Sequence, residues 1–466
     1  MSENKCSRRI FLMGSAAATM AGCATTRTST VPSLKRLGYK SPNEKLNMAA
    51  IGAGGKGGGD IGQCGDLGEN IIALCDPDQR QAAGSIRKFP NARLYADYRE
   101  MLDKEKTLDA CTISTPDHVH AVAAIDCMKR GIHVYCQKPL TRTIWEARRL
   151  TEVARETGVS TQMGNQGHSG DGVRDLCEMV WAGIAGNIRE VHAWTNRPIW
   201  PQGIEGIFPD GKVGLLPEEE IPEHVDWEAW LGPMPYRPYN SAYMPFKWRG
   251  WWDFGGGALA DMACHILDPA NWALCLTNPD TVECLREEGN NEQTFPTKSI
   301  IRFTFPRRGS MPPLTLYWYD GDLHPPIPEG VDPAKLERRM RDGSSGSIFI
   351  GDKGVLYTGT YGGGSELVAG EHMKDFEKPQ EILPRLPGGD DDVRQKIDWI
   401  RACKGGAKAG SNFEYSGPLT EWVVMGNLCL KFPQQKLFWD AEKLKFTNCP
   451  EANQWVKPHF RKGWTL

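Results

Sequence analysis

Three features are missing from this sequence: a long apolar run beyond its first 30 residues, an excess of one charge, and a CxxC cysteine pair. No apolar stretch after residue 30 approaches the ~20 residues needed to span a bilayer. Lys and Arg number 55 against 58 Asp and Glu, for a net charge of −3, and the basic residues are spread along the chain. We therefore expect no nucleic-acid partner and no basic membrane-binding surface.

The 14 cysteines are scattered, and their spacing is not that of metal ligands. Several of them, such as Cys75, Cys111 and Cys136, stand inside apolar, strand-like runs. We interpret most of them as buried thiols that act as small hydrophobic side chains, and we predict no metal site.

The first 44 residues differ from the rest of the chain. Ser7-Arg8-Arg9-Ile10-Phe11-Leu12 resembles a twin-arginine export signal, and Met20-Ala21-Gly22-Cys23 resembles a lipoprotein processing box. Residues 24–44 are rich in Thr, Ser, Pro and Lys and have the composition of a tether. We predict export to the periplasm, with a lipid on Cys23 as a membrane anchor. The alternative is a disordered basic N-terminus.

Residues 47–76 carry the most informative pattern. Apolar runs at 48–51 and 71–75 flank the motif Gly52-x-Gly54-x-x-Gly57, and Asp76 follows 24 residues after Gly52. Such glycines let backbone N–H groups of the next helix approach a pyrophosphate, and an acid at this distance accepts hydrogen bonds from an adenosine ribose. We predict binding of NAD in preference to NADP, through Gly52, Gly54, Gly55, Lys56, Gly57 and Asp76.

Residues 45–165 alternate between apolar strands and helical segments, which predicts a doubly wound parallel sheet, the Rossmann fold. Expected strands are 47–51, 71–75, 109–114, 132–136 and 159–163. Expected helices are 57–67, 79–87, 97–103, 118–130 and 143–157. The strand at 109–114 ends at Thr115 and Pro116, at the sheet edge where α/β proteins bind ligands.

Beyond residue 165 the chain is rich in aromatics and proline, and alternating segments predict a C-terminal α/β domain with an open, mainly antiparallel sheet. Expected strands are 188–195, 299–305, 314–319 and 347–350. One helix is expected over 257–276, others over 391–403 and 418–431, and a loop-rich insertion over 199–250. The predicted divisions are a signal and tether (1–44), a dinucleotide-binding domain (45–165), a substrate domain (166–390) and C-terminal helices with a tail (391–466).

Three side chains are candidates for catalysis. Lys138 directly follows the strand at 132–136, and Asp261 and His265 stand four residues apart, on one face of a helix. Oxidation of an alcohol by NAD needs a group that takes the hydroxyl proton, and His is suited to this near neutral pH. The alternatives are a surface lysine beside a turn and a surface Asp–His pair.

These motifs resemble the Gfo/Idh/MocA oxidoreductases over roughly residues 45–435. The resemblance rests on the glycine turn, Thr115-Pro116-Asp117-His118-Val119-His120, Gln137-Lys138-Pro139, Gly183-Ile184-Ala185-Gly186-Asn187-Ile188 and Asp261-x-x-x-His265. It implies oxidation of a sugar or cyclitol with NAD(P), and it places the family's catalytic lysine on Lys138 and its Asp–His pair on Asp261 and His265. It also implies a homodimer or tetramer. Further expected cofactor contacts are Thr115, Pro116, His120, Gln137, Lys138 and Asn165.

The sequence departs from the family pattern in two places. The family's Glu before the lysine is Gln137 here, and an amide cannot neutralise Lys138 as a carboxylate would. Gly164-Asn165-Gln166-Gly167-His168-Ser169 stands where much of the family has an arginine-containing segment. We predict that Asn165, Gln166 and His168 contact sugar hydroxyls; the alternative is a plain turn between two domains.

Aromatic residues next to acids give a further hint about the substrate. Trp248-Arg249-Gly250-Trp251-Trp252-Asp253 precedes the Asp–His helix, and Tyr317-Trp318-Tyr319-Asp320 ends a strand. Trp252, Trp318 and Asp320 are predicted to bind a pyranose ring, or else the aromatic residues belong to the core.

Export would separate the enzyme from any pool of free nicotinamide cofactor. We therefore expect tightly bound NAD that returns to its starting redox state within the enzyme. An oxidoreductase that passes hydride to a second sugar meets this demand. A glycosidase also meets it if it oxidises a hydroxyl to a ketone, eliminates the glycosidic group, adds water and reduces the ketone. A non-catalytic exported sugar-binding protein is the third alternative.

Overall fold

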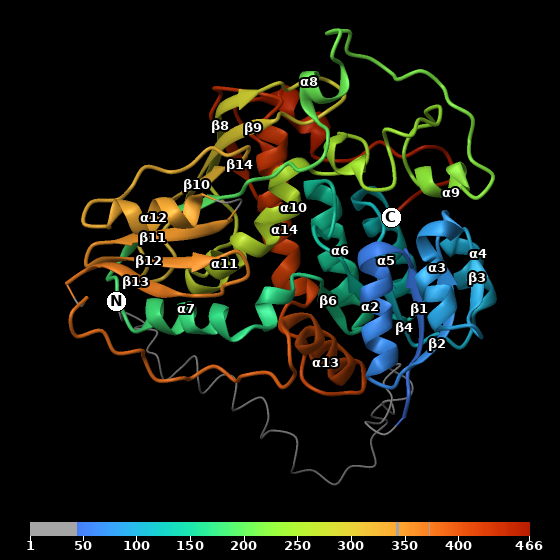
Figure 1. The fold of residues 1–466 in the computed structure, drawn as a ribbon, viewed down its shortest axis with the longest axis horizontal. Coiled ribbons are helices and arrows are strands. Elements are labelled where there is room, and N and C mark those ends of the chain that lie inside the picture. The colour runs from blue at the N-terminus through green and yellow to red at the C-terminus, as the bar shows by residue number, and fades with distance from the viewer. Residues whose placement is uncertain (1–43, 342–343, 372) are drawn as a thin grey trace.

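The computed structural model describes residues 44–341, 344–371 and 373–466 (Figure 1). The twin-arginine motif, Cys23 and nearly all of the tether lie outside the described residues. Within these ranges no helix is both long and apolar enough to cross a membrane. Also within them, no three His, Cys, Asp or Glu side chains are grouped to hold a metal ion. The cysteines of these ranges form no disulfide, and all but Cys275 are buried.

The N-terminal sheet is parallel and has the strand order β3-β2-β1-β4-β5-β6. Its strands are β1 (Asn47–Ile51), β2 (Asn70–Cys75), β3 (Arg93–Tyr95), β4 (Ala110–Ile113), β5 (His133–Cys136) and β6 (Thr161–Met163). Its helices are α2 (Gly55–Asp66), α3 (Gln79–Lys88), α4 (Tyr98–Lys104), α5 (Asp117–Lys129) and α6 (Ile144–Thr157). The predicted Rossmann fold is confirmed. The sequence does not predict β3, because this edge strand is short and mostly exposed.

The second sheet has the order β13-β12-β11-β7-β10-β9-β8-β14-β15. Its strands are β7 (Ile188–Trp194), β8 (Thr281–Glu288), β9 (Lys298–Phe305), β10 (Leu314–Tyr319), β11 (Gly346–Gly351), β12 (Gly354–Gly359), β13 (Glu366–Gly370), β14 (Leu437–Asp440) and β15 (Lys445–Phe446). Neighbouring strands run antiparallel except β7 and β10, which pair in parallel. The prediction of a mainly antiparallel sheet is therefore confirmed.

The single helix predicted over 257–276 is wrong, because two helices occupy this segment. α10 (Gly257–Ile266) ends before Leu267, and α11 (Asp268–Ala273) begins with Pro269 in its first turn. Proline lacks an N–H and favours a new helix start over continuation. The remaining helices are η2 (Gln166–Ser169), α7 (Asp171–Trp181), α8 (Gly203–Ile207), α9 (Trp227–Leu231), η3 (Lys247–Gly250), α12 (Pro333–Met340), α13 (Asp391–Cys403), α14 (Phe413–Cys429) and η4 (Pro450–Trp455).

C-terminal helices join the two sheets (Figure 1). α14 packs against α6 of the Rossmann domain and against α10, while α13 packs against α2 and η2. Trp399 and Cys403 of α13 are buried in the same apolar cluster as Leu46 and Ile61 of the Rossmann domain. Because α14 contacts both α6 and α10, it fixes the position of α10 relative to the Rossmann domain.

The insertion over 199–250 has its own aromatic core and reaches the Rossmann domain (Figure 1). Trp227 and Trp230 stack with ring centroids 4.8 Å apart. The backbone N–H of Asp226 donates to Pro77 O at 2.8 Å, directly after β2. The insertion therefore closes one side of the space between the domains.

Candidate active site

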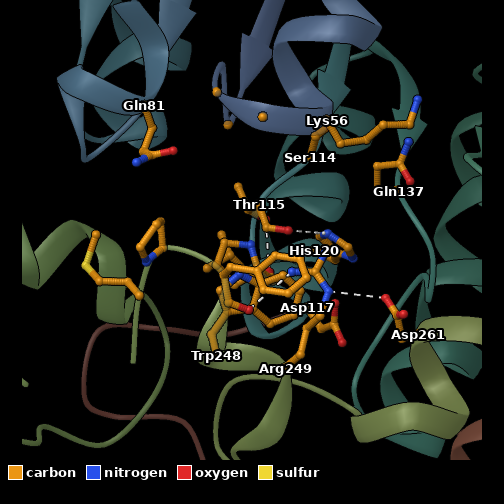
Figure 2. Close-up of a pocket in the computed structure, with 18 of the residues that line it drawn as sticks. Lys56, Gln81, Ser114, Thr115, Asp117, His120, Gln137, Trp248, Arg249 and Asp261 are labelled. Carbon is orange, nitrogen blue, oxygen red and sulfur yellow. Dashed lines mark hydrogen bonds and ion pairs between the residues drawn. The ribbon is translucent and has the colours of Figure 1, made fainter. Parts of the chain in front are cut away.

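A cavity of about 660 Å³ lies between the two domains (Figure 2). Residues that follow β1, β2, β4 and β5 form its Rossmann side, and residues from β7 onward form the other. Of the predicted site residues, its wall contains Gly52, Gly54, Gly55, Lys56, Asp76, Thr115, Pro116, His120, Gln137, Lys138, Gln166, Asp261 and His265. The fold therefore brings most of the predicted residues together, although their roles remain predictions.

The turn after β1 brings the N-terminus of α2 to the cavity wall. Gly52 has a φ of +81°, and a Cβ there would lie 2.6 Å from Ser114 O. The 12-residue helix α2 begins at Gly55 with no side-chain cap and no acidic residue in its first turn. The N–H groups at this end are therefore available to an anion, and the turn fits the pyrophosphate of a dinucleotide.

Gly57 supports this turn and does not line the cavity, so its role as a cofactor contact stays a prediction. A Cβ at Gly57 would lie 2.0 Å from Gly52 O, so Gly57→Ala should displace α2 from the turn. We expect the purified variant to lose most of its bound nucleotide, measured after denaturation. Gly59→Ala on the same helix is the control, because its Cβ would meet nothing within 4 Å. Equal retention by both variants would contradict this packing role.

Asp76 joins the glycine turn to the end of β2. Its Oδ2 accepts the backbone N–H groups of Ala53 and Gly54 at 2.9 and 3.1 Å, and its Oδ1 accepts that of Asp78 at 2.9 Å. Burial raises the pKa of Asp76 to about 6, against the opposing effect of these donors. The carboxyl borders the cavity, so a ribose hydroxyl has a polar partner there.

Lys138, Asp261 and His265 lie together on the cavity wall. Lys138 Nζ donates to the Asp261 carbonyl O at 2.5 Å and to Asp261 Oδ1 at 3.0 Å. Although burial opposes ionisation of Asp261, the charges of Lys138 and Arg249 lower its pKa to about 2. Burial, together with the charge of Lys138, lowers the pKa of His265 well below its usual range. Its Nδ1 is buried without a hydrogen-bond partner among the described residues, and the neutral ring borders the cavity.

Gln137 is bound to a buried carboxylate. Gln137 Nε2 donates to Asp60 Oδ2 at 2.9 Å, and Asp60 is fully buried on α2. Lys396 of α13 and Lys56 lie 2.8 and 2.7 Å from Asp60 Oδ1 and, despite its burial, lower its pKa to about 2. A glutamate at position 137 would face this carboxylate with like charge. The carboxylate partner of Lys138 is supplied by Asp261 instead.

Sequence reasoning missed two arginines on the cavity wall, Arg197 and Arg249. Arg249 Nε donates to Asp261 Oδ1 at 3.2 Å, as Figure 2 shows, and Arg197 Nε lies 3.8 Å from Asp261 Oδ2. Arg249 is the only basic residue in the aromatic run 248–252, which is the signal that pointed to it. Arg197 follows β7 just before Pro198 and carries no comparable signal.

His120 links two cofactor-side loops. Its Nε2 lies 2.9 Å from Thr115 O and its Nδ1 lies 2.7 Å from Pro139 O. Burial lowers the pKa of His120 to about 4, so the ring is neutral and donates to one of these carbonyls at a time. This agrees with a positioning role beside the cofactor.

Asp117 gives the site a testable pH dependence. Burial raises its pKa from 3.8 to about 7, although Arg249 and Lys138 oppose the shift. A raised pKa means that the folded state binds this proton more tightly, so the stability it contributes is present below pH 3.8 and is lost as pH rises through 7. Asp117→Asn should therefore raise Tm relative to wild type more at about pH 8 than at about pH 5. Thermal unfolding checks this, and a Tm difference that does not vary with pH would contradict it.

The predicted sugar contact His168 and the predicted cofactor contact Asn165 do not line the cavity, and their roles stay predictions. His168 is buried, with Nδ1 3.0 Å from Asp268 Oδ2 and its ring stacked 4.5 Å from that of Trp272. Asn165 is also buried, and its Oδ1 lies 3.5 Å from Gln395 Nε2. The tight turn at 164–169 directs these side chains into the domain junction. Of this segment only Gln166 reaches the cavity.

The residues of the predicted aromatic platform, Trp252, Trp318 and Asp320, do not line the cavity either. The Trp252 ring packs 3.7 Å from that of Phe295. Trp318 is fully buried and donates through Nε1 to Asp320 Oδ2 at 2.9 Å. Burial raises the pKa of Asp320 to about 7. These side chains belong to the core, the alternative that the sequence left open, while Trp200, Phe246 and Trp248 line the cavity.

Two family models match the chain. The oxidoreductase family's NAD-binding Rossmann fold matches residues 46–165, and its C-terminal alpha/beta domain matches residues 207–303. These two segments are similar to the two domains of the Gfo/Idh/MocA oxidoreductases, and NAD is the cofactor of the Rossmann domain.

Similar proteins support the same assignment. Inositol 2-dehydrogenase of Leifsonia xyli is 26% identical over 201 residues, 42% of this chain and 57% of that protein. Alpha-N-acetylgalactosaminidase of Shewanella oneidensis is 28% identical over 155 residues, 31% of this chain and 34% of that protein. The chain thus spans about half the length, or less, of the curated relatives it matches. The WlbA dehydrogenase of Bordetella pertussis, solved with NADH and UDP-GlcNAcA, shares the fold with a TM-score of 0.58 at 15% identity, covering 85% of this chain and 99% of that one.

Proposed function

We propose that this protein is an NAD-dependent oxidoreductase that acts on a secondary hydroxyl of a sugar or glycoside. The proposal rests on one observation. Lys138, Asp261 and His265 lie together on the wall of the cavity that the glycine turn also lines. The names of the relatives support a polyhydroxylated substrate, since one acts on inositol and another on a glycoside.

Each of the three side chains has a role that its surroundings favour. Bound NAD supplies the acceptor for hydride. His265, a neutral imidazole that borders the cavity, accepts the hydroxyl proton as the alcohol is oxidised. Lys138 donates a hydrogen bond to the reacting oxygen, and Asp261 Oδ1 holds Lys138 Nζ in place at 3.0 Å. In the reverse direction His265 returns the proton.

We further propose that NAD stays bound through the cycle. The insertion supports this, because Val225 and Asp226 pair with Asp78 and Pro77 just beyond Asp76, while Trp230 lines the cavity. We expect about one nucleotide per chain to be released when protein purified without added NAD is denatured. Protein with no nucleotide would favour the non-catalytic sugar-binding alternative.

The second candidate is an NAD-dependent glycosidase that oxidises, eliminates the glycosidic group, adds water and reduces. Its support is the similarity to a protein named alpha-N-acetylgalactosaminidase. Incubation with glycosides and no added NAD separates the two candidates. Net bond cleavage indicates the glycosidase, whereas a keto-sugar formed together with a reduced acceptor indicates the oxidoreductase.

The cellular setting is also a proposal. The motif at 7–12 supports twin-arginine export to the periplasm, and Cys23 supports a lipid anchor. Pairing of two sheet faces into a dimer or tetramer is proposed from the family resemblance. Fractionation of cells that express the full chain and Cys23→Ala tests the anchor, because the variant should leave the membrane fraction.

A further inference from the structure

Three cations converge on one carboxylate in the substrate half of the cavity. Lys138 and Arg249 lie 3.0 and 3.2 Å from Asp261 Oδ1, and Arg197 lies 3.8 Å from Asp261 Oδ2. His265 is neutral here. Asp117, the other carboxyl near Arg249, is only partly ionised near neutral pH. This half of the cavity therefore holds more positive than negative charge.

The two guanidinium groups have hydrogen-bond capacity to spare. Arg249 is stacked 4.2 Å from the ring of Trp248 and 4.5 Å from that of Phe246, and its Nη1 lies 3.4 Å from Phe246 O. Arg197 donates from Nη1 to Asn196 Oδ1 and keeps about a quarter of its side chain exposed. Because a guanidinium carries five N–H donors, both arginines retain donors that no described residue accepts.

We propose that the substrate is an anionic sugar, whose oxyanion is bound by Arg197 and Arg249 while its reacting hydroxyl faces His265 and Lys138. This inference rests on the proposed function and names its substrate class. A planar guanidinium matches the two oxygens of a carboxylate or phosphate better than a point charge does. The aromatic stacking of Arg249 holds its plane in one orientation, which lowers the entropy lost when the anion binds.

Ligands that differ only in charge test the proposal on the NAD-loaded protein. Binding of the methyl glycosides of glucose, galactose and mannose is compared with that of their uronides and 6-phosphates by calorimetry. We expect the matching anion to bind about 10- to 100-fold more tightly than its neutral counterpart, the range for a charge-assisted hydrogen bond. Tighter binding of a uronide indicates that the site takes a carboxylate, and tighter binding of a 6-phosphate indicates that it takes a phosphate.

Arginine variants supply the second readout. Arg197→Gln and Arg249→Gln should remove most of the preference for the anion. They should change the affinity for the neutral glycoside by less than about 3-fold. Arg249→Lys should keep part of the preference for the anion that Arg249→Gln loses. Arg189→Gln is the matched control, because it removes the same charge from the exposed start of β7. The control should change neither affinity.

Two results would overturn the anionic substrate: neutral glycosides that bind as tightly as every anion, or arginine variants that weaken both classes equally. Failure of the proposed function looks different. An anion that binds through both arginines but is never oxidised contradicts the redox proposal and leaves the anion site intact. Oxidation of neutral glycosides without anion binding supports the redox proposal and contradicts the anion site.

Discussion

His265→Ala is expected to lower kcat by about 10²- to 10⁴-fold, the usual contribution of a positioned acid–base group. The imidazole of His265 is buried, neutral and unpartnered at Nδ1, next to Lys138 and Asp261. No other neutral imidazole borders this part of the cavity among the described residues: His120, the other histidine on the wall, is engaged by two carbonyl groups. The measurement is the steady-state kcat for the sugar that the wild type oxidises fastest, with the nucleotide content of each protein measured in parallel.

Added imidazole should restore part of the activity of His265→Ala, because the deleted ring leaves space for it. A residue with a purely structural role would show no such rescue. His324→Ala is the control, since His324 is an exposed histidine that lies outside the cavity and contacts Met340 O at 2.8 Å. Unchanged kcat in His265→Ala, with normal nucleotide content, would rule out the acid–base role.

Lys396→Met is expected to cost about 3–5 kcal/mol of unfolding free energy, as for other broken buried ion pairs. Lys396 is fully buried on α13, and its Nζ lies 2.8 Å from both Asp60 Oδ1 and the Tyr135 hydroxyl. Without it, buried Asp60 keeps only Lys56 as a close cation. The urea midpoint should fall, and loss of bound NAD should accompany it because α2 carries both Asp60 and the glycine turn.

A double variant separates charge from packing. Asp60→Asn with Lys396→Met removes both charges and should recover part of the stability lost in the single variant. Lys408→Met, which breaks an exposed pair with Glu414, should cost less than about 1 kcal/mol. A Lys396→Met protein as stable as the wild type would show that the pair contributes nothing.

The Rossmann half could be predicted well because its signals are local. Most of its buried strands are short, mainly apolar runs, and the glycine turn and Asp76 occur at a fixed distance along the chain. The same locality placed Lys138 at the carboxyl end of β5. Asp261 and His265 share a helix face wherever that helix lies, so the pair was visible before its position was known.

The substrate half was harder because its signals depend on tertiary packing. Trp318 lies on β10 and Asp320 directly follows this strand, and nothing local tells which face of the sheet is covered. His168 was assigned to the cavity, but Asp268 and Trp272, about 100 residues away, bind it inside the domain junction. Arg197 meets Asp261 only after β7 and α10 are brought together. Partners this distant in sequence leave no periodic pattern.

Single-turnover reduction of the bound nicotinamide tests the central claim most directly. Protein with its own NAD is mixed with the best-binding sugar, without added cofactor, and reduced nicotinamide is followed by absorbance. The account predicts reduction in proportion to the protein, slowed when the reacting C–H is deuterated and nearly absent in His265→Ala. Conversion of the sugar with no reduced nicotinamide and no deuterium effect would contradict it.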